Sequence, residues 1–241
     1  MNPKLLPITA ITKKDILILE DASAPLVISL PVHDIIDATW VRLTSENKNL
    51  YEAPLVRFID FVEDDYEIRL RTATDITYKH VVGLRNTVDF LDKIPKEQLF
   101  QALTAIAIVK TSDNFTILVE RDTGDWPHSL ELPGTFIRTH IYEKGLYEST
   151  LDFLHGDLGI AKMDIKNHSL IGILDYISIC EMMLVYQINL SISFNELTKL
   201  SPKNIFSLPK GYTTEKHLSF FELPLHVPTQ TVLNTNFNHQ F

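Results

Sequence analysis

The stretch between residues 126 and 160 constrains the fold more than any other part of the chain. An apolar segment ends at Pro133-Gly134, a polar loop follows, and apolar residues then recur at helical spacing from Leu146 to Leu158. Proline followed by glycine marks a turn, and apolar residues three and four positions apart mark a helix with one buried face. The sequence therefore predicts a strand, a turn, a loop and an amphipathic helix, in that order.

Composition narrows the class of protein. The chain has 241 residues, 45% of them hydrophobic and 22% charged, so it can bury a sizeable core as one large or two small domains. A net charge of -9 argues against nonspecific nucleic-acid binding, which needs a basic surface. No run reaches the roughly 18 apolar residues of a membrane span. The first residues lack a signal pattern and Cys180 has no second cysteine to pair with, so we expect a cytoplasmic protein with no disulfide within the chain and no membrane or nucleic-acid partner.

The remaining pattern alternates short apolar runs with turn signals and predicts an α/β (α+β) chain. We expect strands at residues 15–20, 25–30, 55–60, 66–72, 104–110, 115–121, 169–179, 182–193 and 218–223. We expect helices at residues 34–46 (capped by Asp34), 96–102, 146–158 and 197–207. A junction near residues 90–102 divides the chain into residues 1–95, residues 96–228 and a loose polar tail at residues 229–241.

The order of elements from residue 102 to residue 223 resembles the Nudix fold, a mixed β-sheet sandwiched between helices. The box of that family runs G-x5-E-x7-R-E-U-x-E-E-x-G-U, where U is aliphatic. Gly159-Ile160 matches the final pair, and Asp157 takes the last glutamate position. Phe153 takes the first glutamate position of the helix, and Gly156 takes the one before Asp157. The resemblance therefore implies a diphosphate-hydrolysing fold whose box has lost most of its acids.

This loss bears on the metal site that the resemblance implies. The family's glutamates hold Mg2+, which prefers octahedral oxygen ligands and activates the attacking water. If the site is active, the cofactor is Mg2+ and the metal-ligating and catalytic carboxylates are Asp157, Asp152 and Glu148, with Glu143 or Glu215 as helpers. If it is inactive, no cofactor is expected. Glu148 and Asp152 are one helical turn apart while Asp157 is rotated away, so an exposed acidic helix face is the simpler explanation.

A second resemblance lies upstream. Residues 39–43, 46–58 and 78–85 are similar to the leader domain of larger Nudix proteins, of the UDP-sugar diphosphatase type and its fungal and plant relatives. Lys48 stands where that leader usually has proline. The resemblance implies an N-terminal, mainly β leader subdomain in residues 1–95, followed by the Nudix-like domain.

Six residues are candidates for contacting a nucleotide or nucleotide-sugar diphosphate. Arginine and lysine suit phosphate, and tyrosine can stack on a base. The candidates are Gly134, Arg121, Arg138, Tyr78, Lys79 and Arg85. For residues 78–85 the alternative is a strand end with a packed tyrosine. The nine histidines show no zinc-binding spacing.

Three functions remain open. The first is a Nudix-like protein that binds a nucleotide or nucleotide-sugar diphosphate with little or no hydrolysis, as Phe153 and Gly156 indicate. The second is a divergent Mg2+-dependent hydrolase with relocated carboxylates. The third is a non-catalytic protein-interaction scaffold. The oligomeric state is not set by the sequence.

Overall fold

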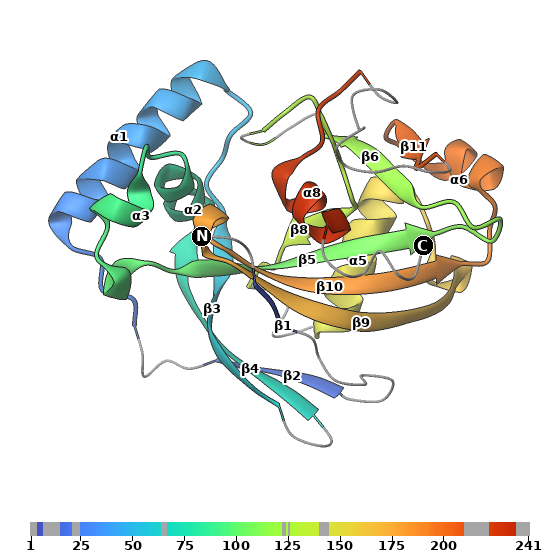
Figure 1. Ribbon diagram of the computed structural model, residues 1–241, viewed down its shortest axis with the longest axis horizontal. Helices are drawn as coiled ribbons and strands as arrows, with labels where there is room; N and C mark the ends of the chain where they lie inside the picture. The colour runs from blue at the N-terminus through green and yellow to red at the C-terminus, as the bar shows by residue number, and fades with distance from the viewer. Residues whose placement is uncertain are drawn as a thin grey trace. The chain divides into compact units, whose positions relative to one another are not determined.

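The computed structural model describes residues 4–6, 15–20, 25–63, 67–121, 124, 126–139, 145–209 and 222–234. The chain divides into two compact units (Figure 1). Unit 1 consists of residues 1–104, 136–149 and 174–183, and unit 2 of residues 105–135, 150–173 and 184–241. The three-part division expected along the chain, at residues 95 and 228, stays a prediction.

The first helix of unit 1 starts earlier than the sequence predicts. Helix α1 spans Leu30–Glu46 and follows the N-cap residue Ser29, with a proline in its first turn. The expected strand at residues 25–30 and the expected cap at Asp34 are therefore wrong. Proline fits the first turn of a helix because the missing N–H has no partner there, so the helix starts a turn earlier than its apolar spacing suggests.

Two short helices follow in the same unit. Helix α2 spans Tyr78–Arg85 and packs against α1, and α3 spans Phe90–Lys93. The segment at 78–85 is thus helical rather than a strand end. The expected helix at residues 96–102 is reduced to a single 3-10 turn, η1, at Lys96–Gln98. The N-terminal part of the chain therefore contains the helices α1, α2 and α3 as well as strands.

The strands of unit 1 form a mixed sheet. β3 (Pro54–Glu63) and β4 (Glu67–Thr77) contain two of the expected strands and pair antiparallel, and β2 (Asp15–Glu20) pairs parallel to β4. β3 also pairs with the start of β5 (Gln101–Lys110), where Arg57 lies opposite Ala102. One apolar cluster of this unit joins buried side chains of its helices, strands and loops: Val32, Ile36, Leu55, Ile76, Val81, Leu84, Phe90, Ile94, Phe100, Ala102 and Cys180.

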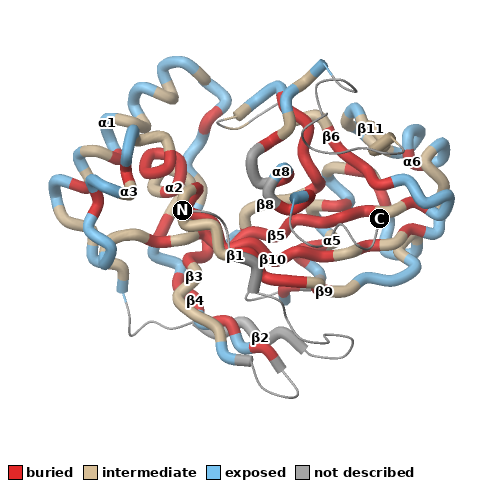
Figure 2. Tube along the Cα trace, in the orientation of Figure 1, coloured by how far each residue is buried: buried red, intermediate tan, exposed pale blue. Residues whose placement is uncertain are grey.

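The larger sheet has the strand order β1-β9-β10-β5-β3-β4-β2, with β8 beside β5. Its further strands are β1 (Lys4–Leu6), β8 (Gly134–Phe136), β9 (Ile165–Tyr176) and β10 (Glu181–Leu190). β5, β9 and β10 each contribute residues to both units. Figure 2 shows β5 and β10 buried along most of their length.

A second, three-stranded sheet lies in unit 2. It has the order β11-β6-β7, with β6 (Ile117–Arg121) antiparallel to both β7 (Ser129–Glu131) and β11 (Ile205–Ser207). The strands expected at residues 104–110 and 115–121 are joined by one bridge, Lys110 with Thr116, because the chain turns at Asn114 and β6 enters the other sheet. This sheet carries part of the site described below.

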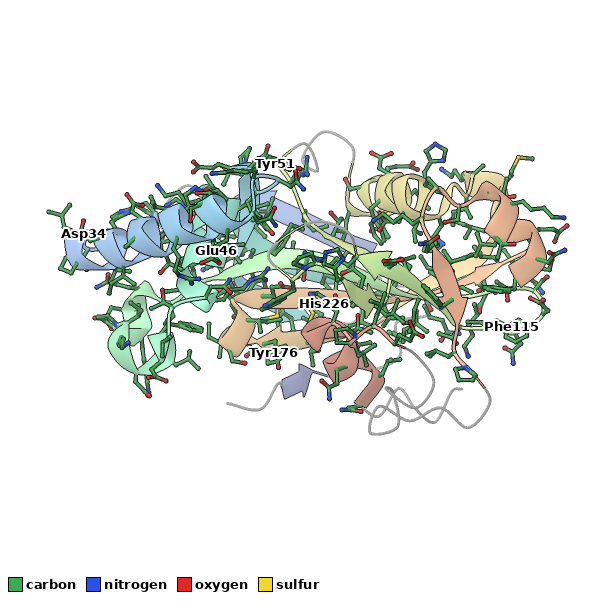
Figure 3. The ribbon with its side chains drawn as sticks, turned by 90° about the horizontal axis from the view of Figure 1, so that it is seen from above. Asp34, Glu46, Tyr51, Phe115, Tyr176 and His226 are labelled. Carbon is green, nitrogen blue, oxygen red and sulfur yellow. The ribbon has the colours of Figure 1, made fainter. Side chains whose placement is uncertain are left out.

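The helices of unit 2 cover both sides of its strands. α5 (Leu146–Leu158) lies on one side of the unit 2 portions of β5 and β10, and α8 (Val227–Asn234) on the other (Figures 1 and 3). α6 (Phe194–Leu200) precedes β11, so the single helix expected at residues 197–207 is a helix and a strand. The remaining 3-10 turns are η2 (Lys162–Asp164) and η3 (Ile177–Ile179).

Two expectations concern the C-terminal region. The strand expected at residues 218–223 falls mostly outside the described residues, and Glu222 and Leu223 form a bend. Residues 229–234, expected in a loose tail, belong to α8, where Val232 and Leu233 are buried. The predicted fold class, a mixed sheet with helices beside it, is confirmed. Among the described residues no helix has the length and apolar character to cross a membrane.

Candidate functional site

Helix α5 has the bounds that the sequence predicts, and it buries one apolar stripe. Leu146, Leu154 and Leu158 are buried, whereas Glu148 and Asp152 are exposed. Burial of three leucines fixes which way the helix faces, since each buried leucine stabilises the fold by about 1.5–3 kcal/mol. The two carboxylates one turn apart therefore lie on the solvent side of the helix, as an ordinary exposed acidic face would.

Two positions that carry glutamate in the family box hold Phe153 and Gly156 here. Phe153 is half-buried, and Gly156 is exposed, with no atom within 4 Å of where a Cβ would be. Neither side chain offers an oxygen ligand. Asp157 is the one acid in register with the box, and its surroundings decide what the helix can do.

Asp157 is paired with a lysine. Its Oδ1 atom lies 2.7 Å from Nζ of Lys203, and the side chains of Lys203 and Asp157 are 27% and 17% exposed. A charge pair shielded from water to this degree is stronger than a surface pair, because water screens it less. The carboxylate at the last box position is therefore engaged by a cation of the chain itself.

The chain near Leu200 packs closely against the C-terminal end of α5, and this packing brings Lys203 to Asp157. Gly159 follows the helix with φ of 69°, and a Cβ there would lie 2.3 Å from the main-chain oxygen of Leu200. Glycine tolerates this left-handed conformation and leaves room for the close approach. Ser201 Oγ lies 3.3 Å from the main-chain oxygen of Asp157 and accepts a hydrogen bond from the N–H of Lys203. The loop that carries Lys203 is thus attached to the helix end.

A second set of charged side chains lies in the same unit as the Asp157–Lys203 pair, in and beside the three-stranded sheet. Glu131 of β7 is buried, and its Oε2 atom lies 2.7 Å from Nη1 of Arg121 on β6 and 3.4 Å from Nδ1 of His226. His226 precedes α8 (Figure 3) and packs edge-on against Trp126, with ring centroids 5.3 Å apart. The strand pairing places Arg121 opposite Ser129, two residues before Glu131. The pair is therefore positioned by backbone hydrogen bonds as well as by charge.

Backbone contacts also fix His226. Its N–H donates to the main-chain oxygen of Leu130, and Leu130 forms a bridge with Leu225. The N–H of Leu132 donates to Oγ1 of Thr229 in the first turn of α8. Residues 130–132 are thus tied to the segment that begins α8.

The pKa of Glu131 depends both on Arg121 and on the Asp157–Lys203 pair. Burial raises the pKa of the Glu131 carboxyl, Arg121 opposes that rise, and the charges of Asp157 and Lys203 act on it with opposite signs. We call these five residues the Glu131 cluster: Arg121, Glu131, Asp157, Lys203 and His226. The cluster holds acids and bases within one unit, at the C-terminal end of α5.

The predicted site residue Gly134 has a structural role. A Cβ at Gly134 would lie 2.9 Å from the main-chain oxygen of Ala105, so glycine allows β8 to approach β5 closely. The N–H of Ala107 donates to the main-chain oxygen of Pro133 in the same region. The Pro-Gly turn therefore joins β7 to the large sheet.

Most of the cations predicted as ligand contacts in unit 1 already have partners. Nη1 of Arg85 lies 2.6 Å from Oε1 of Glu181, and the two side chains are 1% and 7% exposed. Nζ of Lys79 lies 2.8 Å from Oδ1 of Asp37 on α1. A buried arginine that already has a carboxylate is unavailable to phosphate without breaking the pair, which costs about 3–5 kcal/mol.

Tyr78 and Arg138 differ in their exposure. The ring of Tyr78 packs edge-on between Trp40 and Phe136, at centroid distances of 6.3 and 5.5 Å, as the packed-tyrosine alternative predicts. Arg138 is exposed and donates to the hydroxyl of Tyr51 at 2.8 Å, with its guanidinium over that ring. Arg138 is therefore the accessible one of the two.

A metal centre finds no support in the part of the chain that the structure describes, where no group of three His, Cys, Asp or Glu side chains could hold an ion. Glu148 and Asp152 are exposed, and Asp157 faces Lys203. Glu143 and Glu215, the two helper carboxylates, lie outside the described residues.

The sequence did not single out Glu131, Lys203 or His226. A signal was present for Glu131, because a glutamate between Leu130 and Leu132 in a short apolar strand is unusual unless it is paired. No pattern joins Lys203 or His226 to it, since their partners are distant in the sequence. Such pairs are made by tertiary packing alone.

Comparison with known proteins gives only distant similarity. No protein-family model matches the sequence, and no curated protein matches it. Among solved structures, the chain is similar to the C-terminal domain of mouse MUTYH in complex with human PCNA, at 16% identity and a TM-score of 0.39, covering 58% of this chain and 90% of that one. It is also similar to the NUDIX domain of Shewanella oneidensis NrtR complexed with ADP ribose, at 14% identity and a TM-score of 0.37, covering 64% and 97%.

A third similar structure is a bifunctional NMN adenylyltransferase/ADP ribose pyrophosphatase from Francisella tularensis, complexed with AMP and a manganese ion. The identity is 10% and the TM-score 0.40, and the match covers 58% of this chain but 42% of that one. No functional assignment follows from likeness at this level. The function has to be argued from the residues of this chain.

Proposed function

We propose that this chain is a Nudix-like protein that binds a nucleotide or nucleotide-sugar diphosphate with little or no hydrolysis. The observation that carries the proposal is the ion pair of Asp157 with Lys203, at 2.7 Å. The one acid in register with the Nudix box is thereby neutralised by the chain. The two neighbouring box positions, Phe153 and Gly156, supply no oxygen.

The residues present do not fit the Mg2+ that the family uses. Mg2+ is usually bound through one or two carboxylates with near-octahedral oxygen geometry. An ammonium group in contact with Asp157 repels a second cation at the same oxygen, and the two exposed acids of α5 are not grouped with it. We therefore assign no metal-dependent step to this chain.

Binding is supported by the composition of the Glu131 cluster. Arg121 and Lys203 place two positive charges in unit 2, each paired with a carboxylate, so a phosphate would join these ion pairs rather than meet an unpaired cation. Trp126 is half-buried beside His226, so an aromatic face accompanies the cations. Aromatic stacking on a base contributes about 1–3 kcal/mol in nucleic-acid complexes. This combination of charge and ring suits a nucleotide better than a simple anion.

Arg138 is a separate candidate in unit 1. Its guanidinium is exposed and already oriented by the hydroxyl of Tyr51. We propose it as a phosphate contact of unit 1, separate from the Glu131 cluster, because the other cations predicted in that unit, Arg85 and Lys79, have carboxylate partners.

Isothermal titration calorimetry with ADP-ribose, UDP-glucose, AMP and inorganic phosphate tests the binding. We expect at least one nucleotide to bind more tightly than phosphate, and Trp126→Leu to weaken that binding about tenfold, or 1.4 kcal/mol. Trp40→Leu, on α1 of unit 1, is the matched control and should leave the affinity unchanged. Absence of binding by every compound would refute the proposal and favour the interaction scaffold.

The hydrolase alternative is decided in the same samples. We expect no product above background by chromatography after incubation with millimolar Mg2+. Turnover that disappears in Asp157→Asn would instead establish the divergent hydrolase. Turnover that survives in that variant but is lost in Glu148→Gln or Asp152→Asn would establish a relocated site on the exposed face of α5.

A further inference from the structure

Lys203 places its ammonium group 2.7 Å from the carboxylate of Asp157, the last acid position of the Nudix box. We propose that Lys203 is the resident cation of the Glu131 cluster, so that unit 2 binds its anionic ligand without a divalent metal ion. The ligand part of this inference rests on the proposed function. The assignment of the cation rests on the geometry of Lys203 alone.

The charges of the two ion pairs in the cluster balance. Glu131 and Asp157 supply two negative charges, and their ion-pair partners Arg121 and Lys203 supply two positive ones. Glu131 is buried, and Asp157 is 17% exposed. Adding a divalent cation would leave an excess of positive charge in a place that water screens poorly. The lysine therefore excludes the metal by charge as well as by occupying the carboxylate.

The position of Lys203 is also built into the fold. Gly159 lets the main chain of Leu200 approach the end of α5, and Ser201 joins the backbone of the helix to that of Lys203. A long lysine side chain loses rotamer entropy when it is fixed. Fixing its backbone next to its partner reduces the number of positions that the ammonium can take. An accidental surface pair would lack such anchoring.

The other two basic groups of the cluster face Glu131. Arg121 is directed at Glu131, at 2.7 Å, and His226 faces the same carboxylate oxygen. Removing the ammonium should therefore leave Asp157 without the cation that faces it. A divalent cation is then the ion best suited to replace the missing charge.

Thermal unfolding with and without millimolar Mn2+ tests the assignment without any ligand. We expect the wild-type Tm to be unchanged by Mn2+. Lys203→Met should unfold about 2–4 °C lower for each kcal/mol lost, and Mn2+ should restore part of that loss. The double variant Lys203→Met/Asp157→Asn should not respond to Mn2+. Lys166→Met, at an exposed lysine of β9, is the matched control and should show neither effect.

Two results of the melting experiment would overturn the inference. One is a wild-type Tm that rises with Mn2+ and loses this rise in Asp157→Asn, because a metal would then bind beside Lys203. The other is a Lys203→Met variant whose Tm does not respond to Mn2+. Lys203→Arg separates charge from shape, since it keeps the positive charge and should stay unresponsive to Mn2+.

A titration with ADP-ribose tests the ligand part. The affinity of the wild-type protein should be the same within about twofold in EDTA and in Mg2+, and a loss of more than about tenfold in EDTA would overturn the inference. If ADP-ribose and the other nucleotides do not bind at all, the proposed function fails, whereas the melting experiment still decides whether Lys203 is the resident cation.

Discussion

Replacing Gly159 by alanine should destabilise the protein, whereas the same change at Gly156, three residues earlier, should stabilise it. Gly159 has φ of 69°, which costs about 1–2 kcal/mol for a residue with a Cβ. The new Cβ would also lie 2.3 Å from the main-chain oxygen of Leu200, so the loop has to move. Such overpacking costs about 1–3 kcal/mol. We expect a total of about 3 kcal/mol and a fall in Tm of about 6–12 °C.

Gly156 provides the matched comparison on the same helix. No atom lies within 4 Å of its Cβ position, and its φ is not in the left-handed region. Alanine there should gain about 0.5–1 kcal/mol, because glycine loses more backbone freedom in a helix. Far-UV circular dichroism during urea and thermal unfolding measures both changes. Equal stability of Gly159→Ala and wild type, or equal losses in the two variants, would refute the reasoning.

Three further predictions concern other parts of the chain. Arg85→Met should cost about 3–5 kcal/mol in urea unfolding, because it leaves Glu181 buried without its partner, while Arg85→Met/Glu181→Met should recover most of that loss. Burial and the neighbouring His33 lower the pKa of His80, whose Nδ1 accepts the N–H of Thr77, so stability should be full above pH 6.5 and should fall as the pH drops below that value. Thr229→Val should cost about 1–3 kcal/mol by leaving the buried N–H of Leu132 without its acceptor.

Each of these has its own control. For the buried pair, Arg42→Met on the exposed face of α1 should change stability by no more than about 0.5 kcal/mol. For the pH dependence, His80→Gln should lose less stability than wild type between neutral pH and the acid side of pH 6.5, and an unchanged slope would contradict the assignment to His80. For Thr229, a serine that keeps the hydroxyl should retain more stability than valine, and equal losses would contradict the hydrogen bond.

The sequence by itself determined the elements with strong local patterns. α5 runs from Leu146 to Leu158 as its apolar spacing predicts, and β3 and β4 contain the strands expected at residues 55–60 and 66–72. Local patterns failed at residues 25–30 and 229–234. In the first case an early proline allowed an earlier helix start. In the second case, residues 229–234 form part of a helix, and two apolar residues of this mostly polar segment, Val232 and Leu233, are buried.

The candidate site was decided largely by the tertiary structure. The missing acids at Phe153 and Gly156 are visible in the sequence, because box positions are counted along one helix. The partner of Asp157 is not, since the close approach of Leu200 to Gly159 brings the loop of Lys203 to the end of α5, and the partners of Glu131 come from β6 and from the segment before α8. Periodicity records which face of an element is buried. The periodicity of a segment does not predict which charged residue, distant in the sequence, will contact it, because such contacts depend on how the loops and sheets pack.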